Sequence, residues 1–174
     1  MTEYGELIET GSVRFVRVLP GPIERVWSHL VESELRGTWL ASGELEPRVG
    51  GKVTLHFDHQ NLTPYGERPP EKWKAMQDGP ITAVGRVIRF EAPRVLAITW
   101  AEDSEVSFEL EPKGREVQLT LTHRRLAKRS DRVETSAGWH SHLGVLEERL
   151  RGEVPQPFWP RVLRFEREYE ERMQ

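Results

Sequence analysis

The chain has 174 residues, a length that suits one domain, and 37% of them are hydrophobic and 30% charged, as in a globular protein of ordinary core size. A net charge of -3 gives no electrostatic reason to expect a nucleic-acid partner, and the lack of cysteine excludes disulfides, thiolate metal sites and cysteine nucleophiles. No stretch approaches the roughly 20 apolar residues of a membrane span and residues 1–10 lack an apolar run, so we expect no membrane span, no signal peptide and a cytoplasmic location.

The first part of the chain predicts a strand followed by two short helices. Apolar residues alternate in part with arginines over residues 13–19, and Pro20-Gly21-Pro22 ends this strand. A helix is expected over residues 22–32, because proline suits a first helical turn and the apolar residues recur at helical spacing. A second short helix should end near Gly37.

The middle of the chain predicts a sheet of about six strands, antiparallel because short turns join neighbouring strands. The predicted strands after the two helices are residues 42–47, 52–58, 82–90, 95–100, 106–110 and 116–123. Residues 59–80 are rich in proline and glycine and read as a long loop with a helical turn at 71–76. Long loops in compact domains are often functional lids, or else they are disordered.

The C-terminal part predicts a long helix over residues 131–151, followed by a linker and a last helix. Trp139, Leu143, Leu146 and Leu150 lie on one helical face, and Gly152 fits the helix end. The prolines at 155, 157 and 160 indicate a stiff linker before an amphipathic helix. We therefore divide the chain into a domain over 1–152 and a linker with a helix over 153–174. The apolar stripe of that helix should pack on its own domain, and a homodimer through it is the alternative.

Several short motifs follow one another in order: Pro22 to Trp27, Trp39-Leu40, Gly50-Gly51, Gly85-Arg86-Val87 through Pro93 to Thr99-Trp100, and Gly138-Trp139 with its leucines. Together they resemble the START-like (SRPBCC) superfamily, and within it the family of activators of the heat-shock-protein-90 ATPase. The resemblance covers about residues 12–152. The chain departs from it at Trp39-Leu40, where members often carry two tryptophans, in the longer 59–80 loop, and in the helix after Pro160.

This resemblance implies an α+β helix-grip fold, in which a curved antiparallel sheet wraps around the long C-terminal helix and leaves a cavity between them. Fold alone does not fix function. The implied ligand-binding residues are Trp27, Trp39, Phe57, Trp100, Phe108, His123, Trp139, His142 and Leu143. Core packing is the alternative for each aromatic residue, since aromatic side chains are commonly buried in cores.

The histidines are the natural candidates for polar or catalytic groups in such a cavity. His142 lies three residues beyond Trp139 and His123 ends the preceding strand, so the two could share a polar patch; the alternative is a surface or hydrogen-bonded histidine. His56, Asp58 and His59 form the one metal-like cluster. On a strand His56 and Asp58 would share one face and His59 would point away from them. His56 also lies opposite the apolar face of its strand, so we expect no metal ion. No cofactor-binding or nucleophile motif occurs, and no cofactor is expected.

Three functions remain open. The first is binding of a small hydrophobic or amphipathic molecule. The second is protein interaction, with a chaperone partner suggested by the resemblance alone. The third is an enzyme of the cyclase or hydrolase kind that uses a pocket histidine or carboxylate. Binding ranks first and catalysis last, so a non-enzymatic role is favoured and the enzyme alternative is left open.

Overall fold

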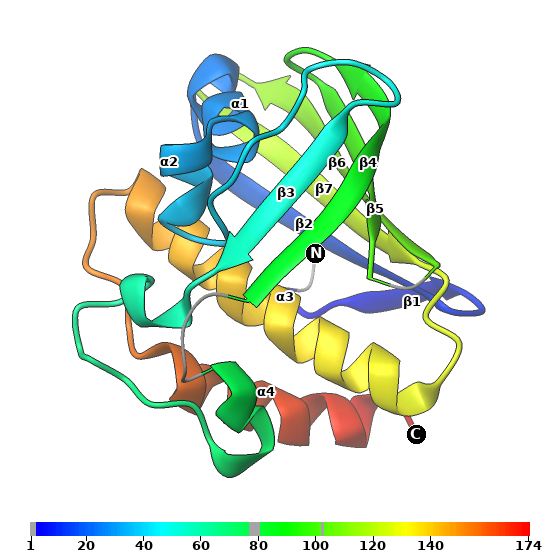
Figure 1. Ribbon diagram of the computed structural model, residues 1–174, viewed down its shortest axis with the longest axis vertical. Coiled ribbons are helices and arrows are strands. Elements are labelled where there is room, and N and C mark those ends of the chain that lie inside the picture. Colours follow the sequence, from blue (N-terminus) through cyan, green and yellow to red (C-terminus); the bar gives the residue numbers. More distant parts are fainter. Residues whose placement is uncertain (1–2, 77–80, 102) are drawn as a thin grey trace.

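A curved antiparallel sheet wraps around one long helix in the computed structural model, which describes residues 3–76, 81–101 and 103–174 (Figure 1). In this part of the chain the sheet has seven strands in the order β1-β2-β7-β6-β5-β4-β3. The strands are β1 (Glu6–Glu9), β2 (Ser12–Pro20), β3 (Lys52–Phe57), β4 (Ile81–Glu91), β5 (Val95–Trp100), β6 (Ser104–Lys113) and β7 (Glu116–Arg124). The predicted α+β helix-grip fold is confirmed.

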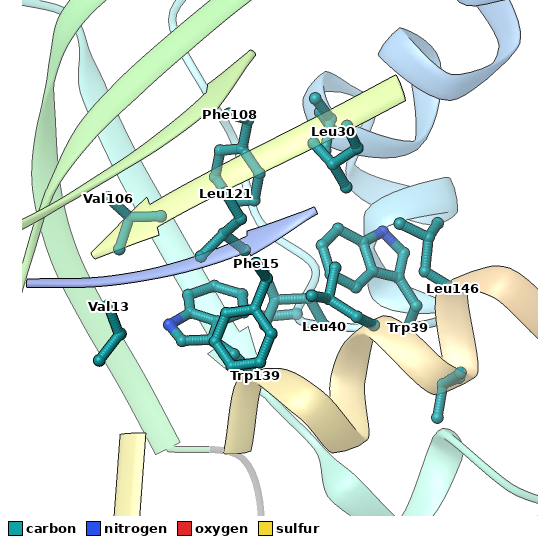
Figure 2. Packing of buried hydrophobic residues seen from close by; sticks show 14 of the residues in the cluster. Val13, Phe15, Leu30, Trp39, Leu40, Val106, Phe108, Leu121, Trp139 and Leu146 are labelled. Carbon is teal, nitrogen blue, oxygen red and sulfur yellow. The ribbon is translucent and has the colours of Figure 1, made fainter. Parts of the chain in front are cut away.

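The central strands form because apolar residues alternate along them and face the long helix α3 (Arg129–Leu150). Figure 2 shows side chains of β2, β6 and β7 meeting Trp139 of α3 and Trp39 in one core. Phe108 lies edge-on between these two indoles, with ring centroids 5.9 Å from Trp139 and 6.5 Å from Trp39. The core therefore closes tightly on the β6 side of the sheet.

Two strand predictions differ from the structure. Strand β1 was not predicted, because all of its residues are exposed and no buried face marks it. Residues 42–47 were predicted as a strand but follow the edge of β3 only through isolated bridges, Ser42 to His56 and Leu45 to Val53. Gly43 lies between them with a φ of 121°, which interrupts the extended backbone.

Helices α1 (Ile23–Val31) and α2 (Ser33–Gly37) lie together at one end of the sheet (Figure 1). The buried guanidinium of Arg36 holds their connection, donating to the carbonyl oxygens of Leu30, Val31, Ala41 and Gly43. Burial lowers the pKa of Arg36 to about 10.

Helix α4 (Phe158–Arg172) runs along α3 and buries its apolar stripe in the same chain (Figure 1). Val162, Phe165, Tyr169 and Met173 are all buried. A homodimer through this stripe would require α4 to leave α3. Pro160, assigned to the linker from the sequence, lies instead in the first turn of α4, where its missing N–H has no helical partner to lose.

The segment after β3 carries two short 3₁₀ helices, His59–Asn61 and Glu71–Met76, and is held against α3 and α4. The carboxylate of Glu67 accepts hydrogen bonds from the backbone N–H groups of Phe158 and Trp159, at 2.8 and 3.0 Å. Lys72 pairs with Glu134 of α3 at 2.8 Å and with Glu166 of α4 at 3.5 Å. Residues 77–80 of the predicted loop lie outside the described residues.

None of the helices in the described ranges combines the length and the apolar character that crossing a membrane requires.

Candidate functional site

A cavity of about 390 Å³ lies between the β3–β5 side of the sheet, helix α3 and the first turns of α4. The segment after β3 covers it with Trp73 and Met76. Most of the wall is apolar. The lining residues are Leu40, Val53, Leu55, Phe57, His59, Trp73, Met76, Ile81, Ala83, Val84, Gly85, Thr99, Trp100, Ala101, Glu134, Thr135, Gly138, Trp139, His142, Phe158, Trp159 and Val162.

Small residues keep this space open where the sheet and α3 face each other. A Cβ atom added at Gly138 on α3 would meet nothing within 4 Å. On β4, Gly85 leaves room for Thr99, whose Oγ1 would lie only 2.8 Å from an added Cβ and which accepts a hydrogen bond from the N–H of Arg86. The missing side chain at Gly138 thus leaves part of the cavity open, whereas the space beside Gly85 is taken by Thr99.

Four of the predicted ligand-binding residues line the cavity: Phe57, Trp100, Trp139 and His142. Phe57 reaches it from β3, Trp100 from β5, and Trp139 and His142 from α3. The ring centroid of Trp100 lies 5.1 Å from that of Trp139 and 5.8 Å from that of Phe57. Whether these side chains contact a ligand stays a prediction.

The other five predicted residues, Trp27, Trp39, Phe108, His123 and Leu143, are buried outside the lining. Trp27 packs edge-on against Phe90, and the indole N–H of Trp39 donates to the carbonyl oxygen of His29 at 2.8 Å. All five are surrounded by packed side chains and do not border the cavity. Their surroundings are those of core residues, which was the alternative role given for the aromatic residues from the sequence.

His123 does not share a polar patch with His142. Its Nδ1 accepts the indole N–H of Trp139 at 2.9 Å. The neutral ring therefore carries its proton on Nε2, which donates to Oγ of Ser104 at 3.0 Å, and this hydroxyl donates to the carbonyl oxygen of Ala101. Burial lowers the pKa of His123 to about 4. Trp139 stands between His123 and the cavity and fixes the imidazole by this bond.

The ring of His142 lies instead beside that of His59, with 5.5 Å between the ring centroids. The Nδ1 of His142 lies 2.7 Å from the carbonyl oxygen of Trp39, and because a carbonyl only accepts, that nitrogen carries the proton. Burial lowers the pKa of His142 to about 3 and that of His59 to about 4, with Asp58 opposing the shift of His59. Both imidazoles are uncharged at neutral pH.

His59 is a lining residue that the sequence analysis missed. It is 7% exposed, and its Nδ1 is buried with no hydrogen-bond partner among the described residues. Its ring stacks on Phe57 and is tilted against Phe158 and Trp159. It lies beyond the end of β3, at the start of a 3₁₀ helix, where the two-residue strand period that was used to orient it from the sequence does not apply.

The other members of the suspected metal cluster lie elsewhere. Nδ1 of His56 is 2.9 Å from Oγ1 of Thr82, and Asp58 accepts from the side chain of Asn61 at 2.6 Å. Within the described ranges, no group of three or more His, Asp or Glu side chains is arranged to hold a metal ion.

Further lining residues absent from the predicted set come from the sheet, from the segment after β3, from α3 and from α4; those outside the sheet include Trp73, Met76, Glu134, Thr135, Phe158, Trp159 and Val162. Phe158-Trp159-Pro160 was assigned to the linker. Proline is common in the first turn of a helix, and that signal would have placed Pro160 in the helix and not in the linker.

The comparisons with known proteins agree with this geometry. A family model described as Activator of Hsp90 ATPase homolog 1-like protein matches residues 20–151. The solution structure of the protein encoded by gene BPP1335 from Bordetella parapertussis is 44% identical, with 98% of this chain and 91% of that one covered and a TM-score of 0.82. That coverage includes the α4 region, which the family model does not reach.

More distant solved structures share the fold alone. CalU16 from Micromonospora echinospora is 24% identical, with 94% of this chain and 88% of that one covered and a TM-score of 0.69. A conserved protein of unknown function, EF2215 from Enterococcus faecalis, is 15% identical, with 97% and 88% covered and a TM-score of 0.70. The comparison with curated proteins found no match. With three quarters of its length matched by the family model, the chain belongs to the Activator of Hsp90 ATPase homolog 1-like family.

Proposed function

We propose that the protein binds a small hydrophobic or amphipathic molecule in the cavity between the sheet and α3. The observation that carries the proposal is the cavity itself, about 390 Å³ and walled mainly by apolar and aromatic side chains with a few polar groups. Sites for small molecules have this character, with volumes of roughly 300–1,000 Å³. The family to which the chain belongs generally binds hydrophobic ligands.

The volume sets the size of the molecule. An apolar cavity of about 150 Å³ holds benzene. A cavity of about 390 Å³ has room for a two-ring aromatic compound or a medium-length alkyl chain. The four lining indoles, of Trp73, Trp100, Trp139 and Trp159, offer flat apolar surfaces to either.

Catalysis has one observation in its favour, the two cavity histidines with shifted pKa values. The direction of the shifts argues against it. A general base works best when its pKa lies near the operating pH, whereas His59 and His142 have values of about 4 and 3. Such weakly basic rings suit hydrogen bonding better than proton abstraction. A chaperone partner rests on the family description alone and stays a prediction.

Native mass spectrometry of the protein as purified from cells tests the proposal, followed by denaturation to release what is bound. We expect a discrete additional mass of a few hundred daltons. The variant Gly138→Leu should lose it, because the added side chain fills the cavity while its Cβ meets no neighbour within 4 Å. Gly144→Ala on the same helix is the matched control, since Gly144 faces Arg161 rather than the cavity.

If no mass is retained, methylnaphthalene serves as a probe, with the indole N–H signals of the lining tryptophans followed by NMR. Saturable shifts in the unaltered protein and in Gly144→Ala, absent in Gly138→Leu, would support the proposal. An additional mass that persists in folded Gly138→Leu would place the ligand elsewhere. Absence of both a retained mass and probe binding would overturn the proposal.

A further inference from the structure

We propose that the ligand is an uncharged amphiphile whose polar end is a hydrogen-bond donor such as an alcohol or phenol hydroxyl, and that His59 and His142 receive this end. The inference rests on the proposed function and adds the chemical class of the ligand.

His59 supplies the first observation. Its side chain lines the cavity and is 7% exposed, yet its Nδ1 has no partner within the described part of the chain. A buried polar atom that is left unpaired costs free energy, so native proteins rarely retain one without a reason. A polar group of a ligand in this cavity would supply the missing partner. The aromatic contacts with Phe57 and Trp159 hold the ring at the wall.

His142 supplies the second observation. Its proton is fixed on Nδ1 by the carbonyl oxygen of Trp39, 2.7 Å away. The neutral ring therefore keeps a lone pair on Nε2, which can only accept. With the two ring centroids 5.5 Å apart, the imidazoles of His59 and His142 form one polar patch on an otherwise aromatic wall. An acceptor at this place calls for a donor on the ligand.

The charges around the cavity decide against an anionic ligand. Glu134 is the one charged residue among the described lining residues, and it is engaged with Lys72 at 2.8 Å. No lysine or arginine is part of that lining. Burial also keeps both imidazoles uncharged at neutral pH, as their lowered pKa values indicate. A carboxylate would lose its hydration without gaining a counter-ion, whereas a hydroxyl would replace its hydration by a hydrogen bond to an imidazole.

Three probes with the same two-ring body separate the possibilities: naphthol, methylnaphthalene and naphthoate, titrated by NMR at neutral pH. We expect naphthol to bind most tightly, methylnaphthalene about tenfold more weakly for the loss of one hydrogen bond, and naphthoate most weakly. Naphthol should also move the imidazole ¹⁵N resonance of Nε2 of His142 in the direction of a hydrogen-bonded nitrogen.

The variant His59→Phe keeps an aromatic ring and removes the ring nitrogens. Naphthol affinity should fall toward that of methylnaphthalene, which should itself be unchanged. His56→Phe is the matched control, because His56 lies three residues earlier, on β3 and outside the lining, and its replacement should leave all three affinities as they are. The ratio of naphthol to methylnaphthalene affinity in the unaltered protein needs no variant, so the test survives if His59→Phe fails to fold.

Each outcome has a separate meaning. Equal affinities for naphthol and methylnaphthalene, or tightest binding of naphthoate, would overturn this inference and leave the proposed function standing. Failure of all three probes to bind would overturn this inference and, together with the absence of a retained mass, the proposed function as well.

Discussion

The indole N–H of Trp139 donates to Nδ1 of His123 at 2.9 Å, and about one turn further along α3 Nδ1 of His142 faces the carbonyl oxygen of Trp39 at 2.7 Å. The same nitrogen is thus an acceptor in one histidine and a donor in the other. Two neutral histidines flank one tryptophan in opposite tautomers, and this fixes which ring nitrogen each can offer to a neighbour.

The first prediction concerns these tautomers. At neutral pH we expect the proton of His123 on Nε2 and that of His142 on Nδ1, because each Nδ1 has a partner of fixed hydrogen-bonding character. Long-range ¹H–¹⁵N correlation spectra of the imidazoles distinguish the two forms directly. In Trp139→Phe, His123 loses its donor, and the unpaired nitrogen should cost about 1–3 kcal/mol in addition to the lost packing. Finding the same tautomer in both rings would contradict the hydrogen-bond assignment.

The second prediction is a loss of stability in mild acid. Burial lowers the pKa of His59 and His123 to about 4 and that of His140 and His142 to about 3, whereas an unfolded histidine titrates near 6.5. Between these values the unfolded chain binds more protons than the folded one. The free energy of unfolding should therefore fall as pH falls below 6.5, by up to about 1.4 kcal/mol per pH unit for each histidine.

Urea unfolding at a series of pH values measures this dependence. His142→Asn keeps a donor for the carbonyl oxygen of Trp39 but does not titrate, so its slope against pH should be smaller by about one proton. Leu146→Ala is the control: it lowers stability, by about 2–5 kcal/mol, without removing a titrating group and should keep the slope. An unchanged slope in His142→Asn would mean that His142 does not contribute to the pH dependence of the free energy of unfolding.

The third prediction concerns Glu67, which caps α4 from the segment after β3. Its carboxylate accepts from the N–H groups of Phe158 and Trp159, which as the first two residues of α4 have no helical acceptor. Glu67→Ala should destabilise the protein by about 1–2 kcal/mol and speed hydrogen exchange at these two amides. The control variant Glu71→Ala, which removes an exposed carboxylate of the same segment, should change neither the stability nor the exchange of these amides. Unaltered exchange in Glu67→Ala would show that the cap does not hold the helix start.

The elements that the sequence predicted are those whose buried face repeats at the period of the element. Val117, Leu119 and Leu121 on β7 alternate toward the core, and Trp139, Leu143 and Leu146 lie along one face of α3. Strand β1 has no such face, and residues 42–47 lose theirs at Gly43. Periodicity reports burial, so it misses exposed or interrupted elements.

The candidate site was predictable only in part for the same reason. Phe57 and Trp139 were found because they belong to periodic elements. His59 follows the end of a strand and Trp73 lies in an irregular segment, so their approach to the cavity depends on tertiary contacts such as that of Glu67 with α4. Trp39 and Phe108 have the same residue types as the lining residues but meet each other, and composition cannot separate the two situations.

The fourth prediction compares two glycines on α3. Alanine favours a helix interior over glycine by about 1 kcal/mol. At Gly138 an added Cβ meets nothing within 4 Å, so Gly138→Ala should gain most of that difference. At Gly144 the Cβ would clash with Nη1 of Arg161, whose guanidinium pairs with Glu148 at 2.5 Å. Gly144→Ala must therefore displace a largely buried ion pair and should gain nothing or lose stability.

Thermal and urea unfolding of the two single variants measure the difference between sites that share one helix and one substitution. The double variant Gly144→Ala with Arg161→Ala removes the obstructing side chain, so the effect of Gly144→Ala measured in the Arg161→Ala background should approach that of Gly138→Ala. Equal effects of the two single variants in the native background would show that Arg161 does not pack on Gly144. A loss of stability in Gly138→Ala would show that the space beside this residue is filled, and the cavity on which the proposed function rests would then be absent.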